Sequence, residues 1–359
     1  MRILFIAGSY PPQKCGVGDY TKHLAGALSK QVGVRVAVLA DEEVAHVRHD
    51  PQVDVFPVVK GWRVSDVPRI VKVLKEWKPD IVHIQYPTQG FYGRKILPYD
   101  LPLIVKGCGK KVVQTWHESF PPHRTSLFMN CLATSRMVVI KPDFTSTMSP
   151  CFRILIPSKE FRCIPNASTI PRAMLADAHR SSIRDRISGN SISLLAFFGF
   201  VYPHKGVEHL FQIAAPERHH IVLIGDLNPS DPYHRKIFDL IHGERWAGHA
   251  TVTGFLPEKE VGEMLCAADA AVFPFTHGAE IWNTSIQAAV AQGTFVLTTS
   301  KKKQGYDEQA NIYYAAPGNY EEMRIALDRH IGRRNPNPPR YGWEEIASAH
   351  LDLYKKILM

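Results

Sequence analysis

The stretch from residue 273 to residue 293 contains the residue types of a site for an anion and a hydroxyl group. Asn283, Thr284 and Ser285 favour the start of a helix, and a run of small residues follows them. The backbone N–H groups at such a start attract negative charge. Glu280 comes just before, where its carboxylate could meet a sugar hydroxyl. An ordinary capped helix after a strand would show the same pattern.

Further candidates follow three apolar runs in the second half of the chain. The first run precedes FGFVYPHKG, which contains Phe200 and Lys205. A lysine there could neutralise a diphosphate, and a plain surface lysine is the alternative. Gly225 follows the second run, and Phe255 and Leu256 follow the third, where they could flank a nucleobase.

The first half of the chain offers a histidine and a glycine loop. His117 and Glu118 follow the apolar run VVQT after one residue, Trp116, so His117 could carry a proton or hydrogen-bond a substrate. A structural histidine would look the same. Gly16 and Gly18 open a helix, where backbone can approach an anionic ligand closely, but a tight turn also explains them.

Short apolar strands alternate with amphipathic helices such as 17–31 and 67–77, which predicts parallel sheets covered on both faces. In the first half we expect strands at Ile3–Ala7, Val34–Leu39, Ile81–Ile84, Val112–Thr115 and Met137–Ile140. In the second half we expect them at Leu194–Phe198, Ile221–Ile224, Thr251–Thr253, Ala271–Phe273, Thr294–Leu297 and Ile312–Tyr314. In such sheets ligands bind beyond the carboxyl ends of the strands, where the candidates above lie.

The strand pattern pauses in the polar stretch from residue 171 to residue 190, which predicts a boundary between two doubly wound domains. We place the first domain at residues 1–172 and the second at residues 173–340. Residues 333–340 are rich in proline and cannot form a regular helix. A final amphipathic helix is expected from Trp343 to Leu358, within a closing segment at 341–359.

Taken in order, these motifs resemble family 4 of the glycosyltransferases over nearly the whole chain. The motifs are the glycine loop at residues 16–18, T-W-H-E at 115–118, I-P-N at 164–166, F-G-F-x-x-P-x-K-G at 198–206 and G-D at 225–226. T-G-F-L-P at 253–257, A-A-D-A-A-V-F-P-F at 267–275, A-A-V-A-Q-G at 288–293 and W-E-E-I-A at 343–347 complete the set.

The resemblance implies an α/β fold of the GT-B type, with two Rossmann-like domains facing across a cleft. It also implies that the first domain binds the acceptor, the second binds the nucleotide sugar, and the last helix returns to the first domain. It implies sugar transfer with retention of the anomeric configuration, with His117, Glu280 and Lys205 in catalysis. The donor-binding residues implied are Gly16, Gly18, Phe200, Gly225, Phe255, Leu256, Asn283, Thr284 and Ser285.

The co-substrate implied is a nucleotide-diphosphate sugar, UDP- or GDP-linked, without another cofactor. No D-x-D motif occurs and the six cysteines lack zinc spacing, so we expect no metal. The family commonly has arginine where Phe200 stands and a second glutamate where Ala288 stands. These departures motivate one alternative, an inactive sugar-nucleotide-binding partner. A GT-B epimerase or phosphorylase is the other.

Composition narrows the setting of the protein. The chain has 359 residues, 45% of them hydrophobic, and no apolar run near the ~20 residues that span a bilayer. No signal peptide is evident, so we expect a cytoplasmic protein. The net charge of +9 favours phosphate-bearing ligands. The basic side chains could form a solvated surface, or a patch that contacts anionic lipid at the inner face of the membrane. No nucleic-acid-binding motif accompanies the charge. The acceptor, whether sugar, lipid-linked or small molecule, and the oligomeric state stay open.

Overall fold

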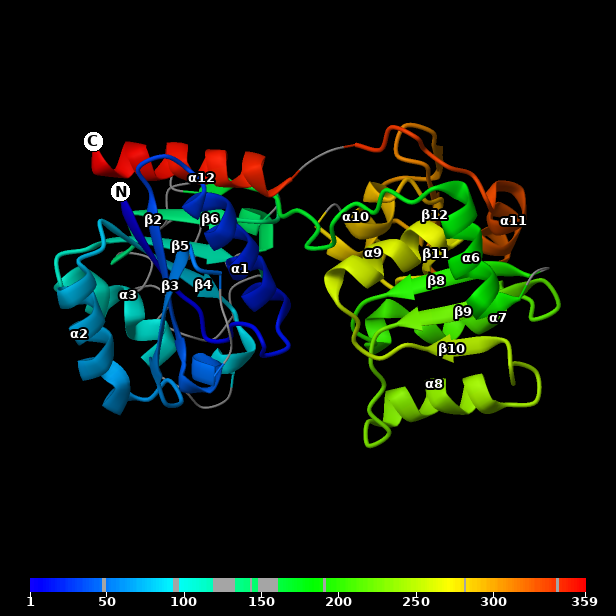
Figure 1. Cartoon of the computed structure of the whole chain (residues 1–359), viewed down its shortest axis with the longest axis horizontal. Helices are drawn as coiled ribbons and strands as arrows, with labels where there is room; N and C mark the ends of the chain where they lie inside the picture. Colours follow the sequence, from blue (N-terminus) through cyan, green and yellow to red (C-terminus); the bar gives the residue numbers. More distant parts are fainter. Residues whose placement is uncertain are drawn as a thin grey trace. The chain divides into compact units, whose positions relative to one another are not determined.

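The computed structural model describes residues 1–46, 50–92, 97–118, 133–142, 144–147, 161–189, 192–280, 282–339 and 342–359. The chain forms two compact units (Figure 1). The N-terminal unit comprises Met1–Ala167 and Tyr341–Met359, and the C-terminal unit comprises Ser168–Arg340. Among the described residues, no helix is long and apolar enough to cross a membrane.

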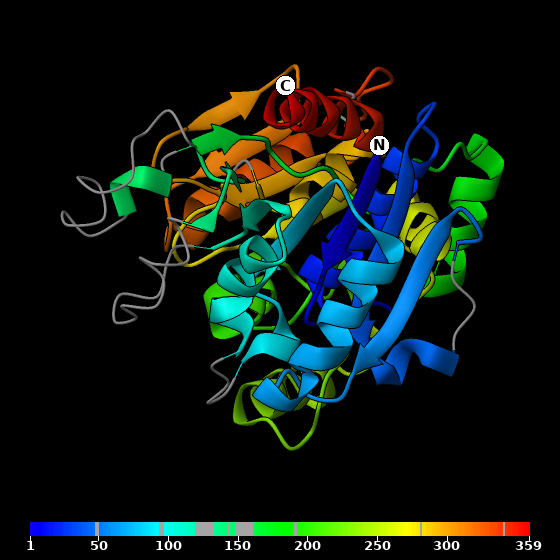
Figure 2. The same cartoon turned by 90° about the vertical axis from the view of Figure 1, so that its left-hand side faces the viewer.

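The N-terminal unit is built on a parallel sheet in the order β3-β2-β1-β4-β5-β6-β7 (Figure 2). The strands are β1 (Arg2–Ile6), β2 (Arg35–Asp41), β3 (Val53–Val59), β4 (Ile81–Tyr86), β5 (Lys111–Trp116), β6 (Arg136–Val139) and β7 (Phe161–Cys163). The helices are α1 (Gly16–Ser29), α2 (Val67–Trp77), α3 (Leu97–Gly107) and α12 (Trp343–Leu358). Strands β1 and β4 are buried almost throughout, as parallel strands covered on both faces must be.

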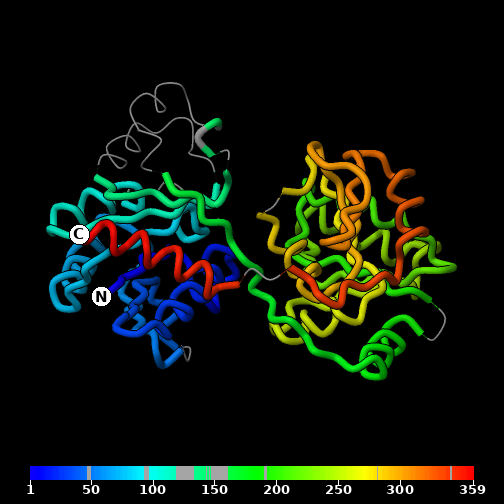
Figure 3. Tube along the Cα trace, turned by 90° about the horizontal axis from the view of Figure 1, so that it is seen from above, coloured from blue at the N-terminus to red at the C-terminus, as the bar shows by residue number. Residues whose placement is uncertain are grey.

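Helix α12 belongs to the N-terminal unit although it ends the chain, and it packs against α1 (Figure 3). Its buried residues recur at helical spacing, so one face of the helix is covered. They are Ile346, Ala347, His350, Leu351, Leu353 and Tyr354. The carboxyl ends of β4 and β5 therefore lie among residues from both ends of the sequence.

The C-terminal unit repeats the design around a sheet in the order β10-β9-β8-β11-β12-β14-β13, in which only the pair β13–β14 is antiparallel among the described strands. The strands are β8 (Ser193–Phe198), β9 (His219–Ile224), β10 (Ala250–Val252), β11 (Ala270–Phe273), β12 (Val296–Thr299), β13 (Gly305–Asp307) and β14 (Ile312–Ala315). The helices are α6 (Asp177–Ser188), α7 (Leu210–Ile213), α8 (Pro232–His242), α9 (Glu258–Ala267), α10 (Thr284–Ala291) and α11 (Tyr320–His330).

The fold confirms each strand that the sequence predicts, with ends that differ by a few residues. Three strands were not predicted: β3, β7 and β13. Strand β3 contains Pro57, which is tolerated because β3 lies at the edge of its sheet. Strands β7 and β13 have three residues each, too few for a clear period. The polar stretch at 171–190 holds α6, a helix of low mean hydropathy with few buried side chains.

Candidate active site

His117 stands at the carboxyl end of β5, as the sequence indicates, and its backbone and ring are both held. Its N–H donates to the carbonyl of Tyr86 at 2.7 Å, and its Nε2 lies 2.9 Å from Gln85 Oε1. The edge of the ring meets Tyr20, with centroids 4.6 Å apart. Burial lowers the pKa of His117 to about 3, and His350 adds a smaller lowering. The ring is therefore neutral at pH 7. With Nε2–H donating to Gln85, Nδ1 is the atom that can accept a hydrogen bond from a hydroxyl.

A second histidine, His83, lies inside the unit rather than on its rim. It is fully buried on β4, with Nδ1 2.5 Å from the hydroxyl of Tyr354 and Nε2 2.7 Å from Thr115 Oγ1. Burial lowers its pKa well below the usual value, and burial lowers the pKa of His350 to about 4. Tyr354 and His350 both come from α12, so this cluster fastens the last helix beneath the strand that carries His117.

The two glycines at the start of α1 differ in their surroundings. A side chain on Gly18 would come within 2.9 Å of the carbonyl oxygen of Ser9, so glycine is required there for packing. A side chain on Gly16 would meet nothing within 4 Å. Gly18 is thus explained by packing against the Ser9 backbone, while Gly16 leaves open space; the close approach of a ligand to this loop stays a prediction.

In the C-terminal unit, Lys205 ends a short 3₁₀ turn (Pro203–Lys205) after β8. Its Nζ lies 4.2 Å from the centroid of the Phe275 ring, and burial lowers its pKa to about 8. Among the residues that the structure describes, no carboxylate pairs with it. The turn ends on Gly206, whose φ of 63° and 2.3 Å approach of Pro274 O to a notional Cβ both require glycine. Within the described part of the chain, Lys205 is thus a partly desolvated cation without a counter-charge, which suits an anion.

The loop before α10 brings Glu280 and Asn283 together. Asn283 Oδ1 accepts a hydrogen bond from the N–H of Glu280 at 2.7 Å, so this side chain does not cap the helix that it precedes. The predicted start of the helix is confirmed, with Asn283 at the N-cap position. The helix therefore starts without a side-chain cap from Asn283, and Thr284 and Ser285 form its first turn.

Glu280 has an ion-pair partner that the sequence did not single out. Lys302 Nζ lies 3.7 Å from Glu280 Oε2, and the N–H of Ala279 donates to the carbonyl of Thr299 at 2.6 Å. Lys302 follows β12, the neighbour of β11 in the sheet. The run of three lysines at 301–303 was the available signal, but the sequence indicated only a basic surface there.

The loops after β8, β9 and β11 converge within the C-terminal unit. The N–H of Thr276 donates to the carbonyl of His204 at 3.1 Å, which ties the loop of Glu280 to the turn of Lys205. A Cβ on Gly199 would lie 3.8 Å from Ser285 Cβ, and one on Gly225 would lie 2.6 Å from Gly199 O. The structure thus gathers Lys205, Glu280, the start of α10 and Gly225 at one edge of the sheet.

Aromatic rings border this edge. The centroid of the Phe200 ring lies 6.1 Å from that of Phe255, in an edge-to-face arrangement. It lies 6.0 Å from the centroid of the Tyr202 ring, in a stacked arrangement. Phe255 is 49% exposed, whereas Leu256 packs against the core. Phe200 thus extends an aromatic surface where the family commonly has a cation. Such a surface can stack on a planar or sugar ring.

Ala288 lies within the core of the C-terminal unit and is 0% exposed. Its carbonyl accepts a hydrogen bond from Gln292 Nε2 at 3.3 Å. The methyl group is covered, so this position offers no polar contact to a ligand.

No set of three or more His, Cys, Asp or Glu side chains could hold a metal ion within the described part of the chain.

The sequence matches two protein families in succession. Residues 15–160 match Glycosyltransferase Family 4, and residues 193–332 match Glycosyl transferases group 1. No curated protein matches the sequence.

Several solved structures share the fold along the whole chain. Sucrose-phosphate synthase from Thermosynechococcus elongatus is 14% identical, with 99% of both chains covered and a TM-score of 0.73. The catalytic domain of starch synthase IV from Arabidopsis thaliana, bound to ADP and acarbose, is 12% identical, with 100% and 99% covered and a TM-score of 0.71. HepE from Anabaena in complex with UDP-glucose is 14% identical, with 99% and 98% covered and a TM-score of 0.66.

Proposed function

The chain belongs to family 4 of the glycosyltransferases and has the GT-B fold, and from this premise we propose that it transfers a sugar from a nucleotide-diphosphate sugar to an acceptor hydroxyl with retention of configuration. One observation carries the proposal. Lys205 is a partly desolvated cation, with no carboxylate partner among the described residues, beside the loop that leads into α10. A diphosphate would supply its missing counter-charge. The structures bound to UDP-glucose and to ADP support a nucleoside diphosphate as the leaving group, and we favour UDP or GDP.

The proposed chemistry follows from where charge develops. As the glycosidic bond breaks, the electron pair moves to a phosphate oxygen, and Lys205 and the first N–H groups of α10 stabilise it. The sugar becomes oxocarbenium-like, and the acceptor hydroxyl attacks from the face that the diphosphate leaves, giving its proton to the departing phosphate oxygen. No divalent metal is required, so turnover should survive EDTA.

The donor sugar is oriented by side chains that neighbouring residues hold in place. Glu280 accepts a hydrogen bond from a sugar hydroxyl, held in place by Lys302 and Asn283. His117 accepts another at Nδ1, because Gln85 takes the proton of Nε2. Neither residue is assigned as a covalent nucleophile. Phe200 and Phe255 offer the nucleobase a stacking surface, and Gly16, Gly18 and Gly225 let the backbone approach the donor.

The test compares Lys205→Ala with Lys259→Ala, a control lysine that lies on α9 with its side chain 85% exposed. UDP- and GDP-sugars are screened with the parent protein by thermal shift, and the best donor is then assayed for release of its nucleotide. Lys205→Ala should lower turnover by ~10²-fold, the scale of one preorganised charge stabiliser. Lys259→Ala should leave it unchanged. Equal turnover in the two variants would show that Lys205 does not stabilise the leaving group.

The alternatives of an inactive partner, an epimerase or a phosphorylase predict different products. An inactive partner binds a donor without consuming it. An epimerase converts the donor without an acceptor, and a phosphorylase needs inorganic phosphate. Analysis of the products by NMR separates these outcomes from transfer, and the anomeric coupling of a transfer product reports retention.

A further inference from the structure

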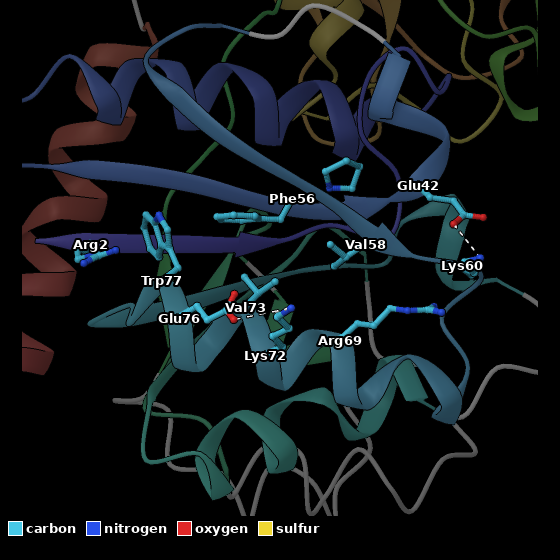
Figure 4. A pocket seen from close by; sticks show the side chains of 11 residues that line it. Arg2, Glu42, Phe56, Val58, Lys60, Arg69, Lys72, Val73, Glu76 and Trp77 are labelled. Atoms are coloured by element: carbon cyan, nitrogen blue, oxygen red, sulfur yellow. Dashed lines mark ion pairs between the residues drawn. The ribbon is translucent and has the colours of Figure 1, made fainter.

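A groove of about 620 Å³ lies in the N-terminal unit, between strand β3 and helix α2 (Figure 4). This volume lies within the ~300–1,000 Å³ that small-molecule sites occupy. None of the residues assigned to catalysis or donor binding lines it. The groove is thus a separate feature, and its capacity to bind a ligand does not depend on sugar transfer.

The groove has an apolar floor because of the way the two elements face each other. Phe56 and Val58 are two residues apart on β3, so both point to the same face of the sheet. Val73 and Trp77 are four residues apart on α2 and face them. Phe56 and Val58 pack on the core yet stay partly exposed, which leaves apolar surface uncovered.

The open edge of β3 is poorly suited to pairing with another strand. Pro57 lies between Phe56 and Val58 and lacks the N–H that a ladder needs. The occupant of the groove is therefore better sought among small molecules than among added strands.

The charges at the rim are balanced everywhere except at one end. Three ion pairs balance the other charges. Lys60 Nζ lies 3.7 Å from Glu42 Oε2, and Lys72 Nζ lies 3.9 Å from Glu76 Oε1. Arg69 Nη1 lies 3.0 Å from Asp66 Oδ1.

Arg2 is the exception. Its guanidinium carbon lies 4.8 Å from the centroid of the Trp77 ring, and its Nε is buried without a hydrogen-bond partner. Among the described residues the guanidinium forms no ion pair, since the nearby Asp80 carboxylate accepts its hydrogen bond from the backbone N–H of Arg2. A buried donor without a partner is costly unless a ligand satisfies it. Figure 4 shows Arg2 and Trp77 at one end of the groove and the Glu42–Lys60 pair at the other.

We propose that this groove binds a single amphipathic anion, with an elongated apolar body on Phe56 and Val58 and its carboxylate or phosphate on Arg2. The guanidinium suits either head group because it can donate two parallel hydrogen bonds. The apolar body covers the floor that the fold leaves exposed. The occupant is one dissolved molecule, not the surface of a bilayer.

The experiment titrates the full chain with octyl phosphate below its micellar concentration, using calorimetry. We expect saturable binding of one molecule per chain. Inorganic phosphate and 1-octanol should each bind at least about tenfold more weakly, because each lacks one half of the interaction. If inorganic phosphate alone bound as tightly as octyl phosphate, the apolar floor would have no role and the proposal would fail.

Variants locate the binding. Arg2→Met should weaken the binding of octyl phosphate by about tenfold or more. Val58→Asp should abolish binding, because it places a carboxylate on the apolar floor. The matched control is Arg35→Met, because Arg35 lies beside Arg2 in the register of β1 and β2 but outside the groove. It should change the affinity by less than about twofold.

Melting temperatures show whether each variant is folded. Arg2→Met keeps the backbone hydrogen bond from residue 2 to Asp80, and Val58 is partly exposed, so both should fold. Unchanged affinity in both variants would place the ligand elsewhere. Binding to phosphatidylglycerol vesicles without binding to the monomeric probe would show a membrane-facing surface instead. Either result overturns the proposal.

Discussion

At the scale of single residues, His117 is notable for being neutral. Its pKa of about 3 lies far below physiological pH, since burial penalises the imidazolium. It cannot deliver a proton at pH 7, so a role in positioning fits it better than a role in acid catalysis.

We predict that His117→Ala impairs transfer more than it impairs binding of the free nucleotide. The reason is that the proposed contact is with the sugar, which the free nucleotide lacks, and that this hydrogen bond strengthens as the transition state forms. Turnover and the affinity for UDP or GDP should be measured on the same preparation. If nucleotide affinity fell as much as turnover, His117 would be structural or would contact the nucleotide.

Ala288 shows how burial changes the meaning of a departure from a family pattern. The family commonly has a glutamate here, which suggests loss of a contact to the donor ribose. In the structure the methyl group is part of the core, 0% exposed. No ribose hydroxyl can therefore be recognised by this side chain.

We predict that a donor and its 2′-deoxy analogue differ by less than about tenfold in kcat/KM. A hydrogen bond to a charged group is worth ~1.5–3 kcal/mol, or about one to two decades in affinity, and position 288 cannot supply one. Parallel assays with the two donors measure the ratio. A larger loss for the deoxy donor would mean that another group contacts the ribose.

At the scale of elements, the last helix is fixed to the sheet by a buried polar contact. The hydroxyl of Tyr354 on α12 meets His83 on β4, and His83 in turn meets Thr115 on β5. The rigid placement of β5 and of His117 at its end thus depends on a helix far away in the sequence.

We predict that Tyr354→Phe lowers the free energy of unfolding by ~1–3 kcal/mol, because a buried ring nitrogen of His83 loses its partner. The control is Tyr202→Phe, since Tyr202 is 41% exposed. Calorimetric melting of both variants gives the comparison. Equal melting temperatures for the two variants would contradict the assigned role of the contact.

The sequence was sufficient to predict helices and strands, whose residue patterns are local. It was insufficient to predict contacts between residues that are distant in the sequence. Helix α2 is found at its predicted ends because its apolar residues recur at helical spacing. The pairing of Glu280 with Lys302 joins loops after two neighbouring strands, and no spacing encodes it. His83 is buried because α12 covers it, and nothing in the sequence of β4 indicates that cover. Burial and pairing of this kind become visible only once the sheet order is known.

At the scale of the whole molecule, both units bury histidines in neutral form. His83 and His350 are buried in the N-terminal unit, and His219 and His220 are buried in the C-terminal unit. Burial lowers the pKa of each of the four. An unfolded chain exposes the same rings to water, where the pKa is ~6.5.

The sign of the resulting pH dependence can be derived from these shifts. Between pH ~6.5 and the lower folded-state values, the unfolded chain binds more protons than the folded chain. Stability therefore rises with pH in this window and is lost on acidification. For His350, whose folded pKa is about 4, the loss between pH 7 and pH 5 is ~2 kcal/mol, since each pKa unit corresponds to ~1.4 kcal/mol.

We predict that the melting temperature of the N-terminal unit falls by several degrees between pH 7 and pH 5, and that His350→Gln reduces this fall. A neutral amide at position 350 removes one group that protonates on unfolding, although it also costs some stability at pH 7. The matched control is His179→Gln, because His179 is exposed on α6 in the C-terminal unit. Calorimetry at a series of pH values separates the transitions, and the one that His350→Gln alters belongs to the N-terminal unit. The prediction would be contradicted by a melting temperature that stays constant from pH 7 to pH 5. It would also be contradicted if the melting temperature depended equally on pH in the parent and in His350→Gln, because the buried histidines would then not set the stability in acid.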